Sequence, residues 1–300
     1  MRKRPFSERI KPLLYLLPFI ISVTIFTIYP IVNVIRMSFL ENYKHLTGAF
    51  DSVGLGNYQK VVSDPLFRQG LGNTVKYVLF VVPISTAIAV VLATLLNQRV
   101  RFQGFFQTAY FLPMVTSSLA VGLAWRFMFN DKYGILNYFL SFLGNDGLKW
   151  LGDPSSNFYA LVIFGIWSIL PNTIILLLSG LQNIDPLYYT AAKVDGAKTL
   201  RIFFRITVPL LAPTIMLVVI INSISTFKMF HELFPLFSGP GVAYNLYTVV
   251  YYIYYEFRVL TPPKYGYAAA AAVILLVTVF TFTMLQRAVN AWSNRERGNQ

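Results

Sequence analysis

Residues 180–209 read GLQNIDPLYYTAAKVDGAKTLRIFFRITVP, and this segment joins two long apolar stretches of the chain. Asp185 can cap a helix over residues 186–194, because its carboxylate accepts free N–H groups and the proline that follows fits the first helical position. Gly196 should end this helix, since glycine tolerates the positive φ of a helix terminus. A second short helix is expected over roughly residues 197–206. The segment therefore predicts a helix–turn–helix between two apolar stretches.

The apolar stretches are long enough to cross a membrane, for which a helix needs about 20 residues. Hydrophobic residues make up 56% of the 300-residue chain and charged residues only 12%, about half the charged share of a soluble domain. The predicted fold class is all-α: a polytopic membrane protein that forms one transmembrane domain over residues 1–300. The segment 180–209 lies between its fourth and fifth spans. The six expected spans are Leu13–Ile35, Val75–Leu96, Phe105–Arg126, Phe158–Ser179, Leu210–Phe227 and Gly266–Gln286.

The distribution of charge predicts the orientation of the spans. The two termini and the loops after the second and fourth spans lie on one side, with 14 Lys and Arg against 4 Asp and Glu. The opposite side has 11 Lys and Arg against 8 Asp and Glu. Because cytoplasmic loops carry the excess of Lys and Arg, both termini are expected in the cytoplasm. This topology explains the net charge of +13 without a nucleic-acid partner.

Several kinds of chemistry are disfavoured by the sequence. Cysteine is absent, the two histidines are far apart, and no phosphate-binding loop is present, so we expect no cofactor, metal or enzymatic activity in this chain. No Asp or Glu lies in the six stretches, whereas proton- and sodium-coupled carriers usually hold ionisable groups inside the membrane. A self-contained secondary carrier or channel for a polar solute stays open as the alternative, because sodium sites built from carbonyls need no carboxylate.

A polar face on the fifth span gives a candidate solute path. At about 100° per residue, one side of a helix carries Asn222, Ser225, Thr226 and Met229. Lys228 follows Ser225 by three residues. Polar groups at this depth need partners in protein or in a water-filled path. Two interpretations stay open from these residues. The face lines the path of the solute, or it makes the interhelical hydrogen bonds that Ser, Thr and Asn commonly form in membranes.

The aromatic residues of the neighbouring spans are also informative. Trp167 lies in the fourth span and offers a flat apolar face and an indole N–H donor, which suit a sugar ring. Pro171 removes one hydrogen bond from the same span. Trp125, near the end of the third span, is expected to anchor the chain at the membrane interface.

The segment 180–209 also carries a recognisable spacing. Thr190–Ala192 is followed after three residues by Gly196, and after nine more by Ile206–Pro209. This spacing resembles the coupling loop of membrane subunits of binding-protein-dependent ABC importers, whose pattern is Glu-Ala-Ala, three residues, Gly, nine residues and Ile-x-Leu-Pro. In this chain Thr stands in place of Glu, and Val in place of Leu. The missing carboxylate removes an ion pair with an ATPase but leaves the helix–turn–helix intact.

Other segments extend the resemblance over almost the whole chain, to the maltose/multiple-sugar branch of these permeases. They are Leu16–Pro18, Tyr29–Pro30, Ser38–Phe39, Asn73–Thr74, Tyr110–Pro113, Gly134–Asn137 and Ser238–Pro240. The chain is similar to the first of two related membrane subunits in such importers. The resemblance implies import of a sugar or oligosaccharide across a bacterial or archaeal inner membrane. It also implies a heterodimer with a second membrane subunit, two cytoplasmic ATPases that bind ATP and Mg²⁺, and an extracytoplasmic solute-binding protein.

Two sets of site residues follow. In maltose-type subunits the sugar pocket is lined by the fourth and fifth spans, which implies a similar role for Trp167, Ser168, Asn172, Asn222, Ser225, Lys228 and Met229. The residues expected to meet the ATPase are Tyr189, Thr190, Ala191, Ala192, Asp195 and Gly196. The sequence leaves the charge of the solute open, because Lys228 can either pair with an anionic group or extend to the membrane surface.

Overall fold

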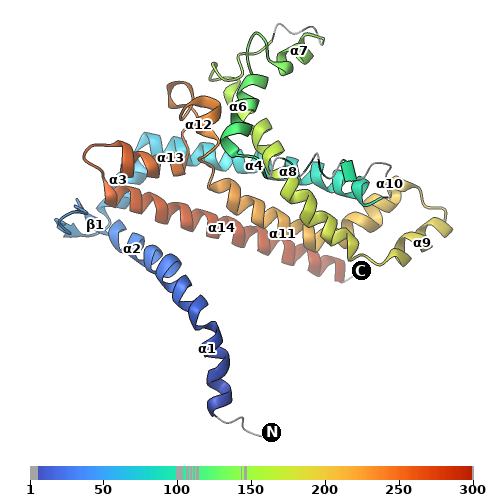
Figure 1. The fold of residues 1–300 in the computed structure, drawn as a ribbon, viewed down its shortest axis with the longest axis horizontal. Coiled ribbons are helices and arrows are strands. Elements are labelled where there is room, and N and C mark those ends of the chain that lie inside the picture. The colour runs from blue at the N-terminus through green and yellow to red at the C-terminus, as the bar shows by residue number, and fades with distance from the viewer. Residues whose placement is uncertain are drawn as a thin grey trace. The chain divides into compact units, whose positions relative to one another are not determined.

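The computed structural model describes residues 6–98, 115–142 and 147–298, and between these ranges residues 104, 105, 108, 110, 112 and 144. The described chain is helical almost throughout (Figure 1). Within it the exception is a pair of two-residue antiparallel strands, β1 (Leu40–Glu41) and β2 (Ser52–Val53). The predicted all-α class is confirmed.

Long and short helices follow one another along the chain, some of them joined by π-helical or 3₁₀ turns. The first group is α1 (Phe6–Val23), the π-helical turn η1 (Thr24–Ile28), α2 (Tyr29–Ser38), α3 (Gly56–Ser63), α4 (Pro65–Asn97), α6 (Ser118–Met128), α7 (Ile135–Ser141) and α8 (Asn157–Gln182). The second group is α9 (Pro186–Val194), α10 (Thr199–Ile202), the π-helical turn η2 (Phe203–Thr207), α11 (Val208–Phe227), α12 (Leu233–Phe237), the 3₁₀ turn η3 (Val242–Tyr244), α13 (Val249–Tyr254), the π-helical turn η4 (Tyr255–Val259) and α14 (Tyr265–Gly298).

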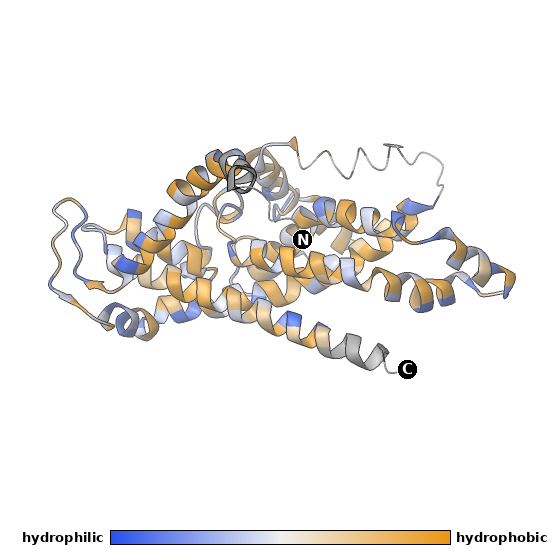
Figure 2. Cartoon of the chain, turned by 90° about the horizontal axis from the view of Figure 1, so that it is seen from below, coloured by the Kyte–Doolittle hydropathy of each residue, from blue (hydrophilic) through white to orange (hydrophobic). Residues whose placement is uncertain are grey.

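Five helical segments of the described chain are long and apolar enough to cross a membrane, and each overlaps one predicted span. They are Tyr15–Ser38, Pro65–Asn97, Asn157–Gln182, Thr199–Phe227 and Tyr265–Ala291. The remaining predicted span, Phe105–Arg126, lies partly outside the described residues, and its described part includes the shorter apolar helix α6. Hydrophobic residues dominate the long helices, whereas hydrophilic residues gather in loops and at helix ends (Figure 2). The polytopic membrane architecture is confirmed.

The chain divides into two compact units. The first consists of Met1–Phe67 and Tyr252–Val277, and the second of Arg68–Tyr251 and Thr278–Gln300. In the first unit the buried side chain of Asn57 donates to the backbone oxygens of Ser38 and Leu40, at 3.0 and 2.9 Å. These bonds hold α3 against the end of α2 and satisfy carbonyls at that helix terminus.

The core of the second unit is built from α4, α8 and α11. Its buried apolar residues include Ala89, Ala93, Leu96, Ile174, Leu177, Leu181, Leu211 and Val218. Small residues one turn apart on α4 let the neighbouring helices approach closely, which is how helices associate where lipid removes the hydrophobic driving force.

A buried acid lies in the first unit, outside the predicted spans. Glu256 of η4 is only 5% exposed, and its Oε2 has no hydrogen-bond partner among the described residues. Burial raises the pKa of the Glu256 carboxyl, Asp64 raises it further, and Lys264 opposes the rise. The folded state therefore binds the proton more tightly than the unfolded state does. Ionised Glu256 destabilises the fold above its raised pKa, and protonation removes the penalty as the pH falls through that value.

The substitution Glu256→Gln should raise the temperature of unfolding at about pH 7.5, and the gain should disappear at about pH 4, where the wild-type acid is protonated. Thermal unfolding followed at both pH values measures this. Asp153→Asn is the control of opposite sign, because hydrogen bonds from the backbone and side chain of Ser155 lower the pKa of Asp153. A Glu256→Gln variant that is less stable than wild type near neutral pH would contradict the assignment.

Candidate functional site

The helices α8 and α11 pack against each other in the second unit. Over residues 168–179 of α8 the exposed side chains recur every three or four residues: Ser168, Asn172, Ile175 and Ser179. Along α11 the same spacing gives Leu217, Ile221, Ser225 and Lys228. Because this spacing marks one face of a helix, each helix presents one stripe that this chain leaves exposed. Four residues of the predicted solute path lie on these two stripes.

Asn222 lies inside the α8–α11 interface instead. Its side chain is 3% exposed and donates a hydrogen bond of 2.8 Å from Nδ2 to Oγ1 of Thr173 on α8. Thr173 in turn donates to the carbonyl oxygen of Ile169 at 2.8 Å. Of the two interpretations of the polar face, Asn222 therefore fits interhelical hydrogen bonding, while Ser225 lies on the exposed side.

A small cavity lies where α4, α8 and the end of α11 meet. Its volume of about 30 Å³ is enough to hold a water molecule. It is lined by Tyr77, Gly165, Ser168, Ile169, Ser225, Thr226, Met229 and Glu232. A side chain at Gly165 would overlap the hydroxyl of Tyr77, so only glycine permits this approach of α4 and α8. The buried Oγ1 of Thr226 has no hydrogen-bond partner in the described part of the chain, and a water in the cavity suits it.

A larger cavity of about 260 Å³, here called the α6–α8 cavity, lies beside the small one. It is lined by Thr116, Ser118, Val121, Phe164, Trp167, Ser168, His231 and Glu232. Ser168 and Glu232 line both cavities, so the two adjoin. The carboxylate of Glu232 accepts a hydrogen bond of 3.1 Å from the backbone N–H of Phe230, which positions one of its oxygens. An indole, hydroxyl groups and a carboxylate together provide the stacking surface and hydrogen bonds that a hydroxylated ligand needs.

The wall of the α6–α8 cavity is stiffened by an aromatic cluster. The ring of Trp125 packs against Trp167 and Phe164, with centroid distances of 5.3 and 5.8 Å. Trp125 is only 8% exposed, so the expectation that it anchors the chain at the membrane interface is wrong. Its ring is held inside the protein by three aromatic neighbours, the third being Phe129 at 5.4 Å.

The structure thus separates the residues of the predicted path. Trp167 and Ser168 line the α6–α8 cavity, while Ser225 and Met229 line the small one. Of the residues described, Asn172 and Lys228 are exposed but line neither cavity.

Sequence reasoning missed His231 and Glu232 because they follow the last residue of the fifth span. Glu232 follows the end of that span by five residues, and this position alone does not mark it as a cavity residue.

The segment between α8 and α11 forms the predicted helix–turn–helix, here called the coupling bracket (α9, the Gly196 turn, α10 and η2). Asp185 accepts a hydrogen bond of 2.8 Å from the backbone N–H of Leu187 and so caps α9. Gly196 has φ +72°. Its N–H donates to the carbonyl of Lys193, and the N–H of Ala197 donates to that of Ala192, at 3.1 and 2.9 Å. These two bonds form a Schellman motif, so the predicted helix end is confirmed.

The surface of α9 shows which predicted coupling residues are accessible. Ala192 is buried and Tyr189 partly buried, while Thr190, Ala191, Asp195 and Gly196 are exposed. The hydroxyl of Thr190 donates to the carbonyl of Pro186 at 3.2 Å, so it bonds within its own helix. Leu187, Ala191 and Val194 are exposed at a spacing of one turn, and Val194 is 83% exposed. This apolar stripe, partly missed from the sequence, is exposed to solvent in the described chain.

The second helix of the bracket is longer than expected. It begins at Thr199 and continues through η2 into α11, so that Thr199–Phe227 is one helical span of 29 residues. The proline at position 209 lies just after the π-helical turn η2, and the helix continues through it although its ring nitrogen cannot donate an internal hydrogen bond. One helix therefore runs from the coupling bracket to the small cavity.

Comparison with known proteins identifies the family. A sequence profile described as "Binding-protein-dependent transport system inner membrane component" matches residues 85–294. The chain belongs to this family. Relatives in the family match more than nine-tenths of the chain. It is 31% identical to the arabinooligosaccharides transport system permease protein AraP of Bacillus subtilis, over 93% of this chain and 88% of the relative. It is 33% identical to the lactose transport system permease protein LacF of Rhizobium radiobacter, over 91% of each.

Another relative is similar in sequence over most of the chain, and two solved structures have a similar fold. The trehalose/maltose transport system permease protein MalF of Thermococcus litoralis is 31% identical over 91% of this chain and 90% of its own. The fold matches a bacterial ABC transporter involved in the import of the acidic polysaccharide alginate, with TM-score 0.79, 24% identity, and coverage of 96% of this chain and 98% of that chain. A bacterial alginate ABC transporter in complex with an alginate pentasaccharide-bound periplasmic protein gives TM-score 0.78 at 25% identity, over 94% and 95% of the two chains.

The Asn222–Thr173 hydrogen bond makes a prediction about stability. Asn222→Ala and Thr173→Val should each lower the stability of the folded chain in detergent, and the double variant should lose less than the sum of the two. The coupling energy should be about 0.6 kcal/mol and at most about 1.7 kcal/mol, as for other interhelical hydrogen bonds in membranes. Unfolding measured for all four proteins checks this. Fully additive effects would show that the two side chains do not interact.

Proposed function

We propose that this chain is the first of two membrane-spanning subunits of an ATP-driven importer that moves a neutral sugar or oligosaccharide into the cytoplasm. The observation that carries the proposal is the coupling bracket, which joins a partner-docking face to a helix that ends at the two cavities. Family membership supports it, and three relatives are named for arabinooligosaccharides, trehalose and maltose, or lactose. The alternative of a self-contained carrier or channel gives no role to the bracket.

The solute path in this proposal follows the exposed stripes of α8 and α11 and the α6–α8 cavity. The predicted residues Trp167, Ser168, Asn172, Ser225 and Met229 lie along it, and we add His231 and Glu232. Asn222 does not line this path but holds α11 against α8 through its hydrogen bond to Thr173. The exposed stripes also offer a surface to the second membrane subunit, which would close the path from the other side.

The charge of the cavity lining favours a neutral solute. Glu232 lines both cavities, and no Lys or Arg lines either of them within the described chain. A carboxylate accepts hydrogen bonds from sugar hydroxyls but repels an acidic sugar. Lys228 is exposed at the end of α11 and lines neither cavity, so it fits the outward-extending interpretation better than a solute-binding one.

In this importer ATP would be hydrolysed by other chains. The sequence contains no phosphate-binding loop, so ATP and Mg²⁺ belong to two partner ATPases, which would dock on Leu187, Ala191 and Val194 of α9. A solute-binding protein would deliver the solute on the opposite side. In this arrangement the chain is one permease domain in the cytoplasmic membrane of a bacterium or archaeon, with both termini in the cytoplasm, as the distribution of Lys and Arg indicates.

The solute path is tested in the assembled importer reconstituted with its binding protein. Glu232→Gln should raise the sugar concentration needed for half-maximal uptake by roughly 2- to 12-fold, the effect of about 0.5–1.5 kcal/mol from one hydrogen bond. Trp167→Ala should lower uptake further, because it also removes the aromatic face. ATP hydrolysis without sugar should be unchanged in both variants, since the bracket is intact.

Tyr159→Ala is the matched control for these variants, because Tyr159 is an exposed aromatic residue of α8 that lies off the exposed stripe of this helix and lines neither cavity in the described chain. Normal uptake by Trp167→Ala and Glu232→Gln alike would place the solute contacts elsewhere. If Glu232→Gln raised the uptake of uronides by more than it changed the uptake of neutral sugars, Glu232 would be supported as the group that excludes acidic sugars.

The turn of the bracket makes a second prediction. Gly196→Ala should weaken coupling of ATP hydrolysis to uptake, because a side chain at φ +72° costs about 1–2 kcal/mol and shifts the turn. The space around Gly196 is open, so the strain is in the backbone alone. The ratio of sugar imported to ATP hydrolysed, in proteoliposomes, is the measurement.

Gly72→Ala is the control for the turn, because this glycine of α4 is also surrounded by open space but lies within a regular helix. Alanine is the better helix former there, so this variant should transport normally. An unchanged coupling ratio in Gly196→Ala would show that the turn does not transmit the signal.

A further inference from the structure

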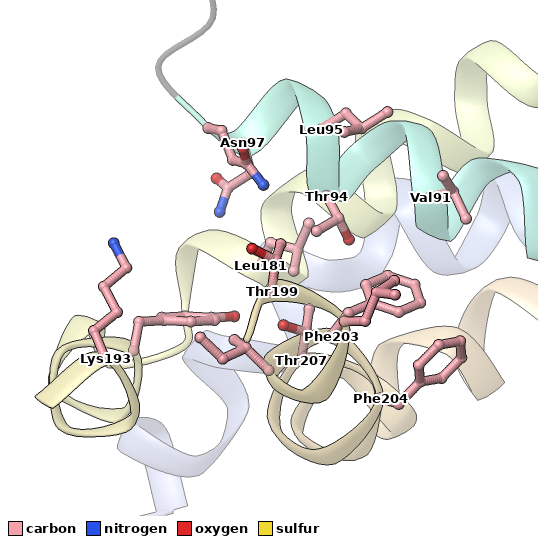
Figure 3. Close-up of a pocket in the computed structure, with 14 residues that line it drawn as sticks. Val91, Thr94, Leu95, Asn97, Leu181, Lys193, Thr199, Phe203, Phe204 and Thr207 are labelled. Carbon is pink, nitrogen blue, oxygen red and sulfur yellow. The ribbon is translucent and has the colours of Figure 1, made fainter. Parts of the chain in front are cut away.

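A groove separate from the two cavities lies between the end of α4 and the coupling bracket (Figure 3). Its volume of about 610 Å³ is within the range of roughly 300–1,000 Å³ that is typical of small-molecule sites. Its walls come from the last two turns of α4, the end of α8, the inner side of α9, and α10 with η2. All of these elements belong to the second unit.

The groove changes from polar to apolar along its length. Lys193 and Asn97 lie at one end, whereas Val91 and Phe204 lie at the other (Figure 3). Large apolar side chains on its walls are strongly exposed, with Leu95 at 51% and Phe204 at 62%. A ligand that satisfies both ends must carry a polar group and an apolar chain, as a lipid does.

The position of the groove along the spans fits the same kind of ligand. Asn97 is the last residue of the span Pro65–Asn97, and Thr199 is the first residue of the span Thr199–Phe227. Both line the groove, so its polar end lies at the ends of these two spans. Val91 lies about 9 Å further along α4 toward the middle of the span, at a rise of about 1.5 Å per residue. The apolar end therefore lies along a helix that is apolar enough to have acyl chains as neighbours.

The charge at the polar end selects an anion. Lys193 is the charged residue of the lining, and no carboxylate lines the groove within the described residues. Lys198, Arg201 and Arg205 of the same bracket are exposed and add positive charge nearby. Basic pockets beside the cytoplasmic ends of spans bind acidic lipid headgroups. A free phosphate would leave the apolar side chains of the lining, such as Leu95 and Phe204, uncovered.

We propose that the groove binds an anionic phospholipid, with its phosphate at Lys193 and the start of its acyl chains against Val91, Leu95 and Phe204. A lipid in this position touches α4 and both helices of the bracket at once. It fills the space behind α9, on the side opposite the exposed stripe of Leu187, Ala191 and Val194. The bracket is thereby stiffened where it receives the ATPase, and acidic lipid becomes a requirement for full coupling.

The test uses the assembled importer, stripped of lipid in detergent and titrated with phosphatidylglycerol or phosphatidylcholine of the same acyl chains. Native mass spectrometry counts the lipids retained. We expect tighter retention of phosphatidylglycerol, and Lys193→Gln should weaken that retention about 5-fold, as expected for one basic residue at an acidic lipid. Lys193→Arg should restore it, because it keeps the charge.

Lys198→Gln is the matched control. It removes the same charge from an exposed position of the bracket that does not line the groove, so retention should stay within about 2-fold of wild type. Equal losses in Lys193→Gln and Lys198→Gln would overturn the site, because only the overall charge of the bracket would then matter. Equal retention of the two lipids would overturn it as well. Absence of retained lipid from the assembled importer would also overturn the proposal, because a partner chain would then cover the groove.

Discussion

The hydrogen bond from Asn222 of α11 to Thr173 of α8 is the constraint on which the candidate site depends. Both side chains are buried in an otherwise apolar interface, so sliding or rotating one helix would leave two polar groups without partners. In the register that this bond selects, Ser168 and Ser225 reach the same small cavity. Trp167 is then directed to the α6–α8 cavity, where Trp125 and Phe164 hold its ring.

The same helix connects these cavities with the coupling bracket. Thr199–Phe227 is a single span whose first turns belong to the bracket and whose last residues border the small cavity. The helix is continuous over this length, although Pro209 and Pro213 each remove one internal hydrogen bond from it. A displacement of α9 that moved Thr199 would therefore also displace Ser225. In the proposed importer this continuity lets a chain without a nucleotide site use energy released in its partners, and a lipid behind α9 would govern how freely the bracket moves.

Local chemistry explains what the sequence could predict. Asp185 and Gly196 determine the ends of α9 through capping and a positive φ, which depend on neighbours within a few residues. Helical periodicity placed Asn222 and Ser225 on one face. It could not show that α8 covers Asn222 and leaves Ser225 exposed. The burial of Trp125 and the placement of Glu232 depend on elements that are distant in sequence, so no pattern along the chain revealed them.

The central claim is that energy reaches the solute path through the exposed face of α9. The chain contains no cysteine, so Val194→Cys introduces a single thiol at an 83% exposed position, to which a short photoactivatable maleimide can be attached. In the assembled importer, irradiation should link this chain to an ATPase subunit, and ATP should change the yield. The same reagent on Ser179→Cys of α8 should label no ATPase. Absence of an ATPase product from Val194→Cys in an importer that still hydrolyses ATP would contradict the account.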